Sequence, residues 1–227
     1  MYPYLLTSVV VIEKLPNVIL YSLPAFILWV AYYLYLYYRV QRNPLGTAIG
    51  TYNAIRRTWV TSILRNKEHI LAVQTLRNWS MSAAFLASTA SLLALGVLSF
   101  VLKPDDLTII ALNHNDFLLN DEDAIVFARF KLLFLMVSLF VSFFSFSLAI
   151  RYYNKAGFIL CIHDLKSHYH HKTYARRTVF NGALNYMIGM RSYYLSVPLA
   201  LWLLGTAWLY LGILLILLIQ FRTDYRP

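Results

Sequence analysis

The sequence predicts an all-α membrane protein, a four-transmembrane-helix bundle with amphipathic helices on the cytoplasmic side. Three observations predict this fold class: four long stretches without charged residues, a composition of 59% hydrophobic and 13% charged residues, and a separation of basic from acidic connecting segments. Soluble domains carry about 25% charged residues. We therefore take residues 1–227 as a single polytopic membrane domain.

The uncharged stretches predict the membrane spans. About 20 apolar residues, at ~1.5 Å rise per residue, cross ~30 Å of hydrocarbon, and a helix satisfies all its backbone hydrogen bonds there without water. Residues 1–7 carry no Lys or Arg, so no cleavable signal peptide is predicted and the first span is retained. The uncharged stretches 15–38, 78–102, 132–150 and 192–221 predict spans at about 18–38, 79–102, 130–150 and 193–220.

The connecting segments predict the orientation. Segments 39–77 and 151–191 are basic, whereas segment 103–128 holds six of the chain's ten acidic residues. Short loops rich in Lys and Arg stay in the cytoplasm, so the acidic loop and both termini are expected outside a cell inner (plasma) membrane. The net charge of +10 then lies beside membrane ends, which favours anionic lipid over nucleic acid as a partner.

Segment 39–77 contains a predicted interfacial helix. Asn43 can cap it and Pro44 suits its first position. Apolar residues then recur at spacings of three and four, while Arg57 and Arg65 point elsewhere. This helix either binds lipid or a partner, or covers the inner ends of the spans. Its apolar residues are Ile49, Tyr52, Ile55, Trp59 and Ile63, and the site residues predicted on this interfacial basic helix are Arg56, Arg57 and Trp59.

Segment 151–191 resembles the first basic segment. Phe180, Leu184 and Met187 recur at helical spacing, and the phrase Thr-Tyr-Ala-Arg-Arg-Thr at 173–178 resembles Thr-Tyr-Asn-Ala-Ile-Arg-Arg-Thr at 51–58. Both phrases lie on the same predicted side of the membrane. The similarity reflects either a parallel internal repeat or chance.

Small residues predict a helix-packing face on span 79–102. Small side chains at four-residue intervals let two membrane helices approach closely. In span 130–150, Ser138, Ser142 and Ser145 share one face and either bond to neighbouring helices or line a polar conduit. The predicted packing face consists of Ser80, Ala84, Ala87, Ser88 and Ser91.

A polar group lies at the inner mouth of span 79–102. Gln74, Arg77 and Asn78 immediately precede the apolar run. Arg77 must extend toward the headgroups, pair, or line a wet cavity. If it faces the bundle, the three side chains form a cluster that can hold an anion or a lipid headgroup.

Several of these motifs resemble the family called domain of unknown function 599, integral membrane proteins of bacteria and plants. The most specific block is Gln-Thr-Leu-Arg-Asn at 74–78 followed by Leu-Ala-Ser-Thr-Ala at 86–90. The resemblance implies a multi-span membrane protein and brings no catalytic residue with it. It also rests on Asn43-Pro44, on Arg57 with Trp59-Val60, on Ile150-Arg151-Tyr152 with Asn154, and on Gly189-Met190-Arg191-Ser192-Tyr193-Tyr194 with Pro198, Trp202 and Gly205.

The sequence offers little chemistry for catalysis or cofactors. None of the six His residues lies in an uncharged stretch, so haem between membrane helices has no axial ligand. The His residues at 163, 168, 170 and 171 lack the usual metal-ligand spacing, and the acids at 121–123 are adjacent rather than spaced around one ion. We expect no cofactor, no metal, no catalytic residue and no enzymatic activity.

The function predicted from these features is association. We expect a structural or accessory subunit that contacts membrane lipids and either other membrane subunits or copies of itself, and no nucleic acid. The alternative is an oligomeric ion or small-solute channel or transporter. It would have to be an oligomer, because a single bundle of four spans is too thin to enclose a pore. A third hypothesis, an enzyme acting on lipid, requires titratable groups that converge on a cavity at the inner leaflet.

Overall fold

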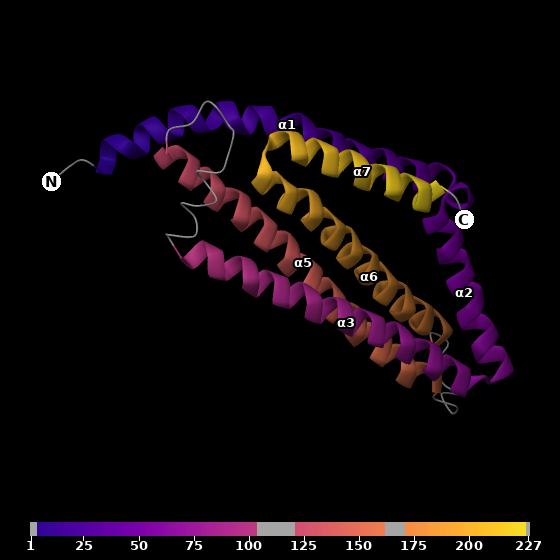
Figure 1. The fold of residues 1–227 in the computed structure, drawn as a ribbon. Helices are drawn as coiled ribbons and strands as arrows, with labels where there is room; N and C mark the ends of the chain where they lie inside the picture. The colour runs from indigo at the N-terminus through magenta and orange to yellow at the C-terminus, as the bar shows by residue number, and fades with distance from the viewer. Residues whose placement is uncertain (1–3, 104–120, 162–170, 226–227) are drawn as a thin grey trace. The chain divides into compact units, whose positions relative to one another are not determined.

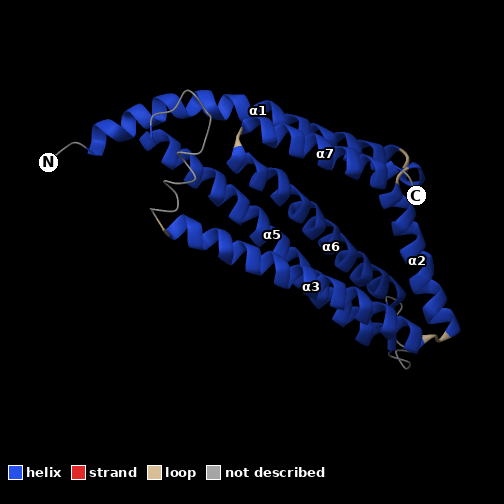
Figure 2. Ribbon diagram, viewed as in Figure 1, coloured by secondary structure: helices blue, strands red, loops and turns tan. Residues whose placement is uncertain are grey.

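Helices make up nearly all of the described chain. The computed structural model describes residues 4–103, 121–161 and 171–225, and no strand occurs among them (Figures 1 and 2). The predicted all-α fold is confirmed. Residues 104–120 of the predicted acidic loop lie outside the described residues. The elements are α1 (Tyr4–Arg42), η1 (Pro44–Gly46), α2 (Ala48–Asn66), α3 (His69–Leu102), α5 (Asp121–Cys161), α6 (His171–Leu201), η2 (Trp202–Leu204) and α7 (Thr206–Tyr225).

Within the described residues, four helices are long and apolar enough to cross a membrane. They are α3, α5 over Ala124–Cys161, α6 continued through η2 over His171–Leu204, and α7. The number four agrees with the prediction, but α1, which holds the expected first span, is not among these helices, and α6 and α7 are separate candidates. The expected spans 18–38, 79–102 and 130–150 lie inside α1, α3 and α5.

The expected span at 193–220 is not one helix. Pro198 lies inside α6, the chain tightens into η2, and Gly205 then adopts φ 137° before α7 begins. A side chain on an L-residue disfavours this backbone conformation, so glycine allows the chain to turn there. The uncharged stretch 192–221 therefore holds the end of α6 and most of α7, and the prediction of a single continuous span is corrected.

An ion pair joins α6 to the C-terminal end of α7. Arg191 Nη2 on α6 donates to both carboxylate oxygens of Asp224 on α7, at 3.0 and 3.1 Å. The C-terminal end of α7 therefore lies beside Arg191, which belongs to the basic segment 151–191.

A tight turn joins α1 to α2. Pro44 occupies the first position of η1 rather than of the predicted interfacial helix, and Thr47 caps α2 by accepting a hydrogen bond from Gly50 N at 3.3 Å. Asn43 precedes η1 without a side-chain cap of its own. A Cβ on Gly50 would clash with the carbonyl oxygen of Pro44, so only glycine fits this position.

The chain forms two compact units by internal contact. The first consists of Met1–Tyr38, Leu93–Ser138 and Tyr194–Phe221. Its core centres on Trp202, which is 1% exposed and packs edge-on against Phe26 and Phe127 at centroid distances of 5.5 and 5.7 Å. Aromatic rings from α1, α5 and η2 thus hold this unit together.

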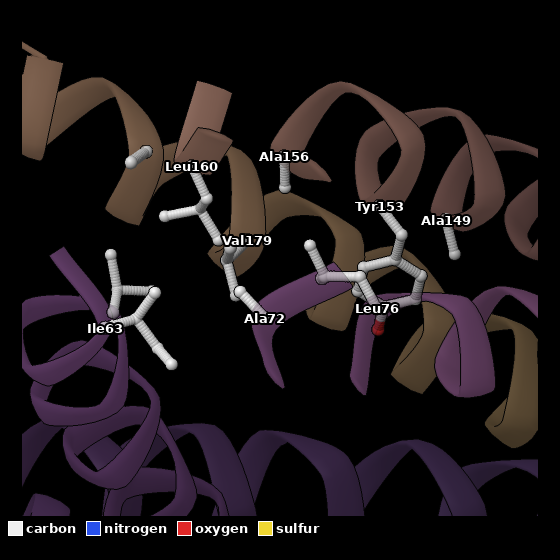
Figure 3. Packing of buried hydrophobic residues seen from close by; sticks show 10 residues of the cluster. Ile63, Ala72, Leu76, Ala149, Tyr153, Ala156, Leu160 and Val179 are labelled. Carbon is white, nitrogen blue, oxygen red and sulfur yellow. The ribbon is translucent and has the colours of Figure 1, made fainter. Parts of the chain in front are cut away.

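The second unit consists of Arg39–Leu92, Leu139–Tyr193 and Arg222–Pro227. Figure 3 shows its core, where side chains of α2, α3, α5 and α6 meet. Small residues let these helices approach, and Ser142 Oγ donates to the carbonyl oxygen of Gly189 at 2.9 Å. Its core residues are Val60, Ile63, Ala72, Leu76, Ala149, Tyr153, Ala156, Leu160, Ala175 and Val179.

Candidate functional site

The small residues of α3 form two stripes. Ala83, Ala87 and Ala90 are buried and pack inside the chain. Ala84 and Ser88 are exposed, on a face that also presents Phe85 at 74% and Leu92 at 69% exposure. The intramolecular contacts of α3 therefore use the alanine stripe and leave the second stripe uncovered.

The predicted packing face on α3 is thus divided by the fold. Ala87 is buried, Ser80 and Ser91 are half-buried, and Ala84 and Ser88 are exposed. Ser80 Oγ lies 3.5 Å from Oδ1 of Asn154 on α5, and Ser91 Oγ donates to the carbonyl oxygen of Ser88. We call the exposed part the outer stripe. It consists of Ala84 and Ser88, flanked by the half-buried Ser80 and Ser91.

The predicted polar cluster lies on the same exposed side of α3. Gln74, Arg77 and Asn78 are all exposed. Arg77 precedes Ala84 by seven residues and Ser88 by eleven, so helical periodicity aligns it with the outer stripe. The cluster therefore does not face a bundle interior within this chain, and the arrangement suits contact with headgroups or with a neighbouring molecule.

The three predicted interfacial residues of α2 have different surroundings. Arg56 is half-buried, donates from Nη1 to Oδ1 of Asn53 at 3.2 Å, and lies 5.9 Å from the centroid of the Tyr52 ring. Burial lowers the pKa of Arg56 from its ordinary value, because desolvation disfavours the cation, while the nearby Tyr153 and Tyr52 act in the opposite direction. Arg57 is exposed.

Trp59 is part of an aromatic series that links three helices. Its ring lies 5.6 Å from that of Trp79 on α3, which lies 5.5 Å from that of Tyr153 on α5. Of the predicted apolar face of α2, Ile63 is buried, whereas Tyr52 and Ile55 are 53% and 54% exposed. Helix α2 therefore has a face packed on the protein and a separate exposed apolar face.

The fold assigns a role to Arg176 that sequence reasoning missed. Its Nη2 donates to Oγ1 of Thr61, so α6 is joined to α2 at this point. Arg56 and Arg176, the first arginines of the two similar phrases, are both half-buried, whereas Arg57 and Arg177 are exposed. The similarity between segments 51–58 and 173–178 drew attention to Arg176, but nothing in the sequence identifies Thr61 as its hydrogen-bond partner.

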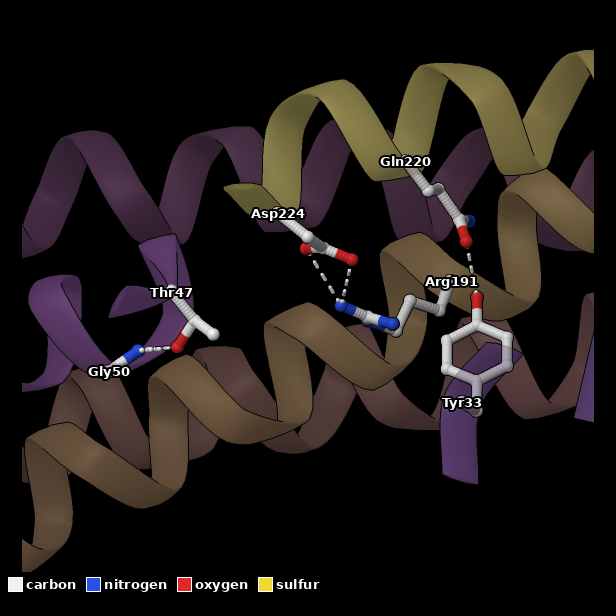
Figure 4. Close-up of polar contacts among 6 residues, drawn as sticks. All are labelled: Tyr33, Thr47, Gly50, Arg191, Gln220 and Asp224. Atoms are coloured by element: carbon white, nitrogen blue, oxygen red, sulfur yellow. Dashed lines mark hydrogen bonds and ion pairs between the residues drawn. The ribbon is translucent and has the colours of Figure 1, made fainter. Parts of the chain in front are cut away.

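A second contact that the sequence did not predict holds the C-terminal end of α7. The side chains of the Arg191–Asp224 ion pair are only 16% and 11% exposed (Figure 4). Arg39 lies 5.8 Å from the centroid of the Tyr225 ring. In the first unit, Tyr33 Oη donates to Oε1 of Gln220 at 2.7 Å, also drawn in Figure 4. These contacts depend on the helix break at Gly205, which uncharged length alone could not reveal.

Among the described residues, Lys131 is the most deeply buried ionisable side chain. It is 0% exposed inside the candidate span of α5, with Nζ 4.5 Å from the Phe127 ring centroid and 5.5 Å from that of Trp202. Aromatic faces attract cations, and an ionisable residue within a membrane span is a candidate for function. The uncharged stretch that defined the span begins one residue later, so sequence reasoning passed over Lys131.

Within the described ranges, no group of three or more His, Cys, Asp or Glu side chains lies close enough to hold a metal ion. The predicted His run extends outside the described residues at 163, 168 and 170, and the side chains of residues 121–123 are also outside them. Ser142 of the serine stripe bonds to α6. Its contact supports helix packing at that position.

With this geometry described, the chain can be compared with known families. The family described as protein of unknown function, DUF599, matches residues 20–227. The chain belongs to the DUF599 family. Comparisons with curated proteins and with solved structures gave no match.

The motifs on which the DUF599 resemblance rested lie at structurally demanding positions. Asn43 and Pro44 form the turn before α2, Gly189 accepts the hydrogen bond of Ser142, and Arg191 binds Asp224. Trp202 and Gly205 provide the aromatic centre of the first unit and the break before α7. These DUF599 motifs therefore carry the fold, and the exposed block at Gln74, Arg77 and Asn78 does not contribute to that packing.

Proposed function

We propose that this DUF599 protein is a structural or accessory subunit of the inner (plasma) membrane, which associates with copies of itself or with a larger membrane complex through the outer stripe of α3. The observation that carries the proposal is that α3 is the least buried candidate span. Only 17% of its apolar window is buried, against 39%, 28% and 28% for the other three. Its exposed face nevertheless carries small residues.

Small residues on an exposed membrane helix favour protein over lipid as the neighbour. Lipid tails are as apolar as leucine, so close packing rather than the hydrophobic effect drives helices together, and small side chains allow that close packing. Ala84 and Ser88 lie beside a row of larger exposed side chains formed by Met81, Phe85 and Leu92. A neighbouring helix can approach α3 most closely over the small residues. The proposed role is non-catalytic and needs no cofactor.

Crosslinking tests the outer stripe directly. The free Cys161 is exposed and must first be changed to Ser. In that background, Ala84→Cys and Ser88→Cys are expected to form disulfide-linked species in membranes. Val137→Cys on α5, which is 53% exposed, is the matched control and is expected to remain uncrosslinked.

Mass measurement after gentle solubilisation distinguishes the outcomes. A defined oligomer of this chain supports self-association, and a defined heteromer supports a larger complex. A monomer, with equal crosslinking at residues 84 and 137, contradicts the proposal. The channel alternative predicts solute flux in liposomes that an oligomer carries and empty liposomes do not.

We further propose that α1 also crosses the bilayer, so the chain crosses five times and its C-terminus lies in the cytoplasm with the two basic segments. The uncharged stretch 15–38 lies in α1, and Arg191 holds Asp224 beside the basic segment. Most of the Lys and Arg residues that flank the spans then lie on one side, with Lys103 and Arg129 among the exceptions. A C-terminal green fluorescent protein fusion is expected to fluoresce, and an active C-terminal alkaline phosphatase fusion would contradict this topology.

A further inference from the structure

One face of α2 carries a row of arginines. Arg57, Thr61 and Arg65 are spaced by four residues, so their side chains lie one above the other on the same side of the helix. Arg57 and Arg65 are exposed. Thr61 Oγ1 donates to the carbonyl oxygen of Arg57 at 2.8 Å, which fixes the hydroxyl between the two guanidinium-bearing side chains.

A third guanidinium reaches this face from α6. Arg176 Nη2 donates to the same Thr61 hydroxyl. The Nε of Arg176 is buried and has no hydrogen-bond partner among the described residues. Arg176 is therefore held at the centre of the row with part of its donor capacity unused.

No described carboxylate neutralises these three residues. The acid nearest in sequence is Glu68, an exposed residue whose Oε1 lies 3.5 Å from Nδ2 of Asn66. The other half-buried arginines have acceptors: Arg191 binds Asp224, and Arg56 binds Asn53. Arg176 donates to Thr61, and the exposed Arg57 and Arg65 extend from the same face of α2. The three positive charges therefore lie on one face, and a bound anion would offset their mutual repulsion.

We propose that Arg57, Arg65 and Arg176 form a binding site for a phosphate group on the α2–α6 face of the second unit. Guanidinium groups donate in a planar fork that matches the oxygens of a phosphate, and charge-assisted hydrogen bonds are the stronger ones. The phosphate belongs either to an anionic lipid headgroup or to a soluble phosphate compound. The site is separate from the outer stripe of α3 and does not depend on the association proposed above.

The test compares two variants of equal charge in the full-length protein. Arg57→Gln with Arg65→Gln removes two members of the site, and both side chains are exposed, so folding is expected to persist. Arg151→Gln with Arg177→Gln removes two other exposed arginines of the second unit and is the matched control. Unchanged melting temperature and elution volume establish that each variant is folded.

Two measurements distinguish the sources of the phosphate. Native mass spectrometry of protein in mixed phosphatidylglycerol and phosphatidylcholine nanodiscs reports lipid adducts, and calorimetry in phosphatidylcholine nanodiscs reports pyrophosphate binding. The site variant is expected to lose at least about tenfold of the wild-type affinity in one assay, while the control loses less than about twofold. Arg176→Gln is expected to act like the site variant.

The measurements can also overturn the site. An equal loss of affinity in the site and control variants would show that the ligand is attracted to positive charge in general and not to this site. Wild-type protein that neither prefers phosphatidylglycerol nor binds pyrophosphate would exclude the site. A lipid-only result assigns the headgroup, and a pyrophosphate-only result assigns a soluble ligand. Crosslinking through Ala84 is independent of all these outcomes.

Discussion

The two units accommodate buried or half-buried positive charge in different ways. In the first unit, Lys131 lies against the faces of Phe127 and Trp202. In the second unit, arginines meet oxygen atoms, as Arg191 does at Asp224 and Arg176 at Thr61. Ring faces stabilise a cation without adding a polar group to a membrane span, whereas oxygen acceptors suit helix ends near the interface.

The largest expected effect reverses the charge in the first unit. Lys131→Glu places a carboxylate against the electron-rich faces of two rings and is expected to lower the free energy of unfolding by more than about 3 kcal/mol. Lys131→Met keeps the length of the side chain and should cost less than about 1.5 kcal/mol. Thermal unfolding in detergent measures both. If the two variants are equally stable, the contacts with the aromatic rings do not explain why Lys131 is buried.

The next effect compares a glycine in each unit. Gly50→Ala in the second unit would drive a Cβ into the Pro44 carbonyl and is expected to cost about 2 kcal/mol or more. Gly96→Ala in the first unit meets no atom within 4 Å and should instead stabilise α3 by up to about 1 kcal/mol. Unfolding midpoints report both. A harmless Gly50→Ala would show that the turn between α1 and α2 adapts readily.

The contacts of α7 provide a third comparison. Asp224→Asn weakens a charged pair in the second unit and is expected to cost about 1–2 kcal/mol. Tyr33→Phe removes a neutral hydrogen bond in the first unit and should cost about 0.5–1 kcal/mol. A double-mutant cycle of Asp224→Asn with Arg191→Gln isolates the pair energy. A coupling near zero would mean that the ion pair does not hold the end of α7.

The smallest effect concerns single serines. Ser142→Ala removes the bond to Gly189 between α5 and α6 of the second unit and is expected to cost about 0.6 kcal/mol. Ser99 in the first unit bonds only to Gly96 on its own helix and is exposed, so Ser99→Ala should change stability less. Chemical unfolding in mixed micelles resolves the difference. If Ser99→Ala costs more stability than Ser142→Ala, the stabilising effect of these serines does not come from hydrogen bonds between helices.

The sequence by itself determined the helical class, the existence of long apolar helices and the separation of basic from acidic segments. These properties follow from the length of uncharged stretches and from where Lys and Arg occur, which are local or additive quantities. They led to a count of four spans, and four described helices are candidate spans, although α1 is not among them and the last predicted span is divided between α6 and α7. They also predicted a helix after Asn43, although α2 begins at Ala48 and Pro44 belongs to the separate η1.

The sequence could not determine which of two similar faces is buried. Ala83 and Ala84, or Ala87 and Ser88, differ little in size and polarity, yet only Ala83 and Ala87 pack inside the chain. The same holds for Arg56 and Arg57 on α2. Their surroundings depend on where the other helices lie, so adjacent residues of one type receive different partners.

Only the tertiary structure decided the path of the last uncharged stretch and the partners of the buried cations. A long apolar run is compatible with one helix or two, and the backbone at Gly205 selects two. That turn brings Asp224 to Arg191, and packing of η2 brings Trp202 to Lys131. Hydrophobicity acts without direction, whereas a backbone turn, an ion pair and a cation over a ring each require a specific geometry.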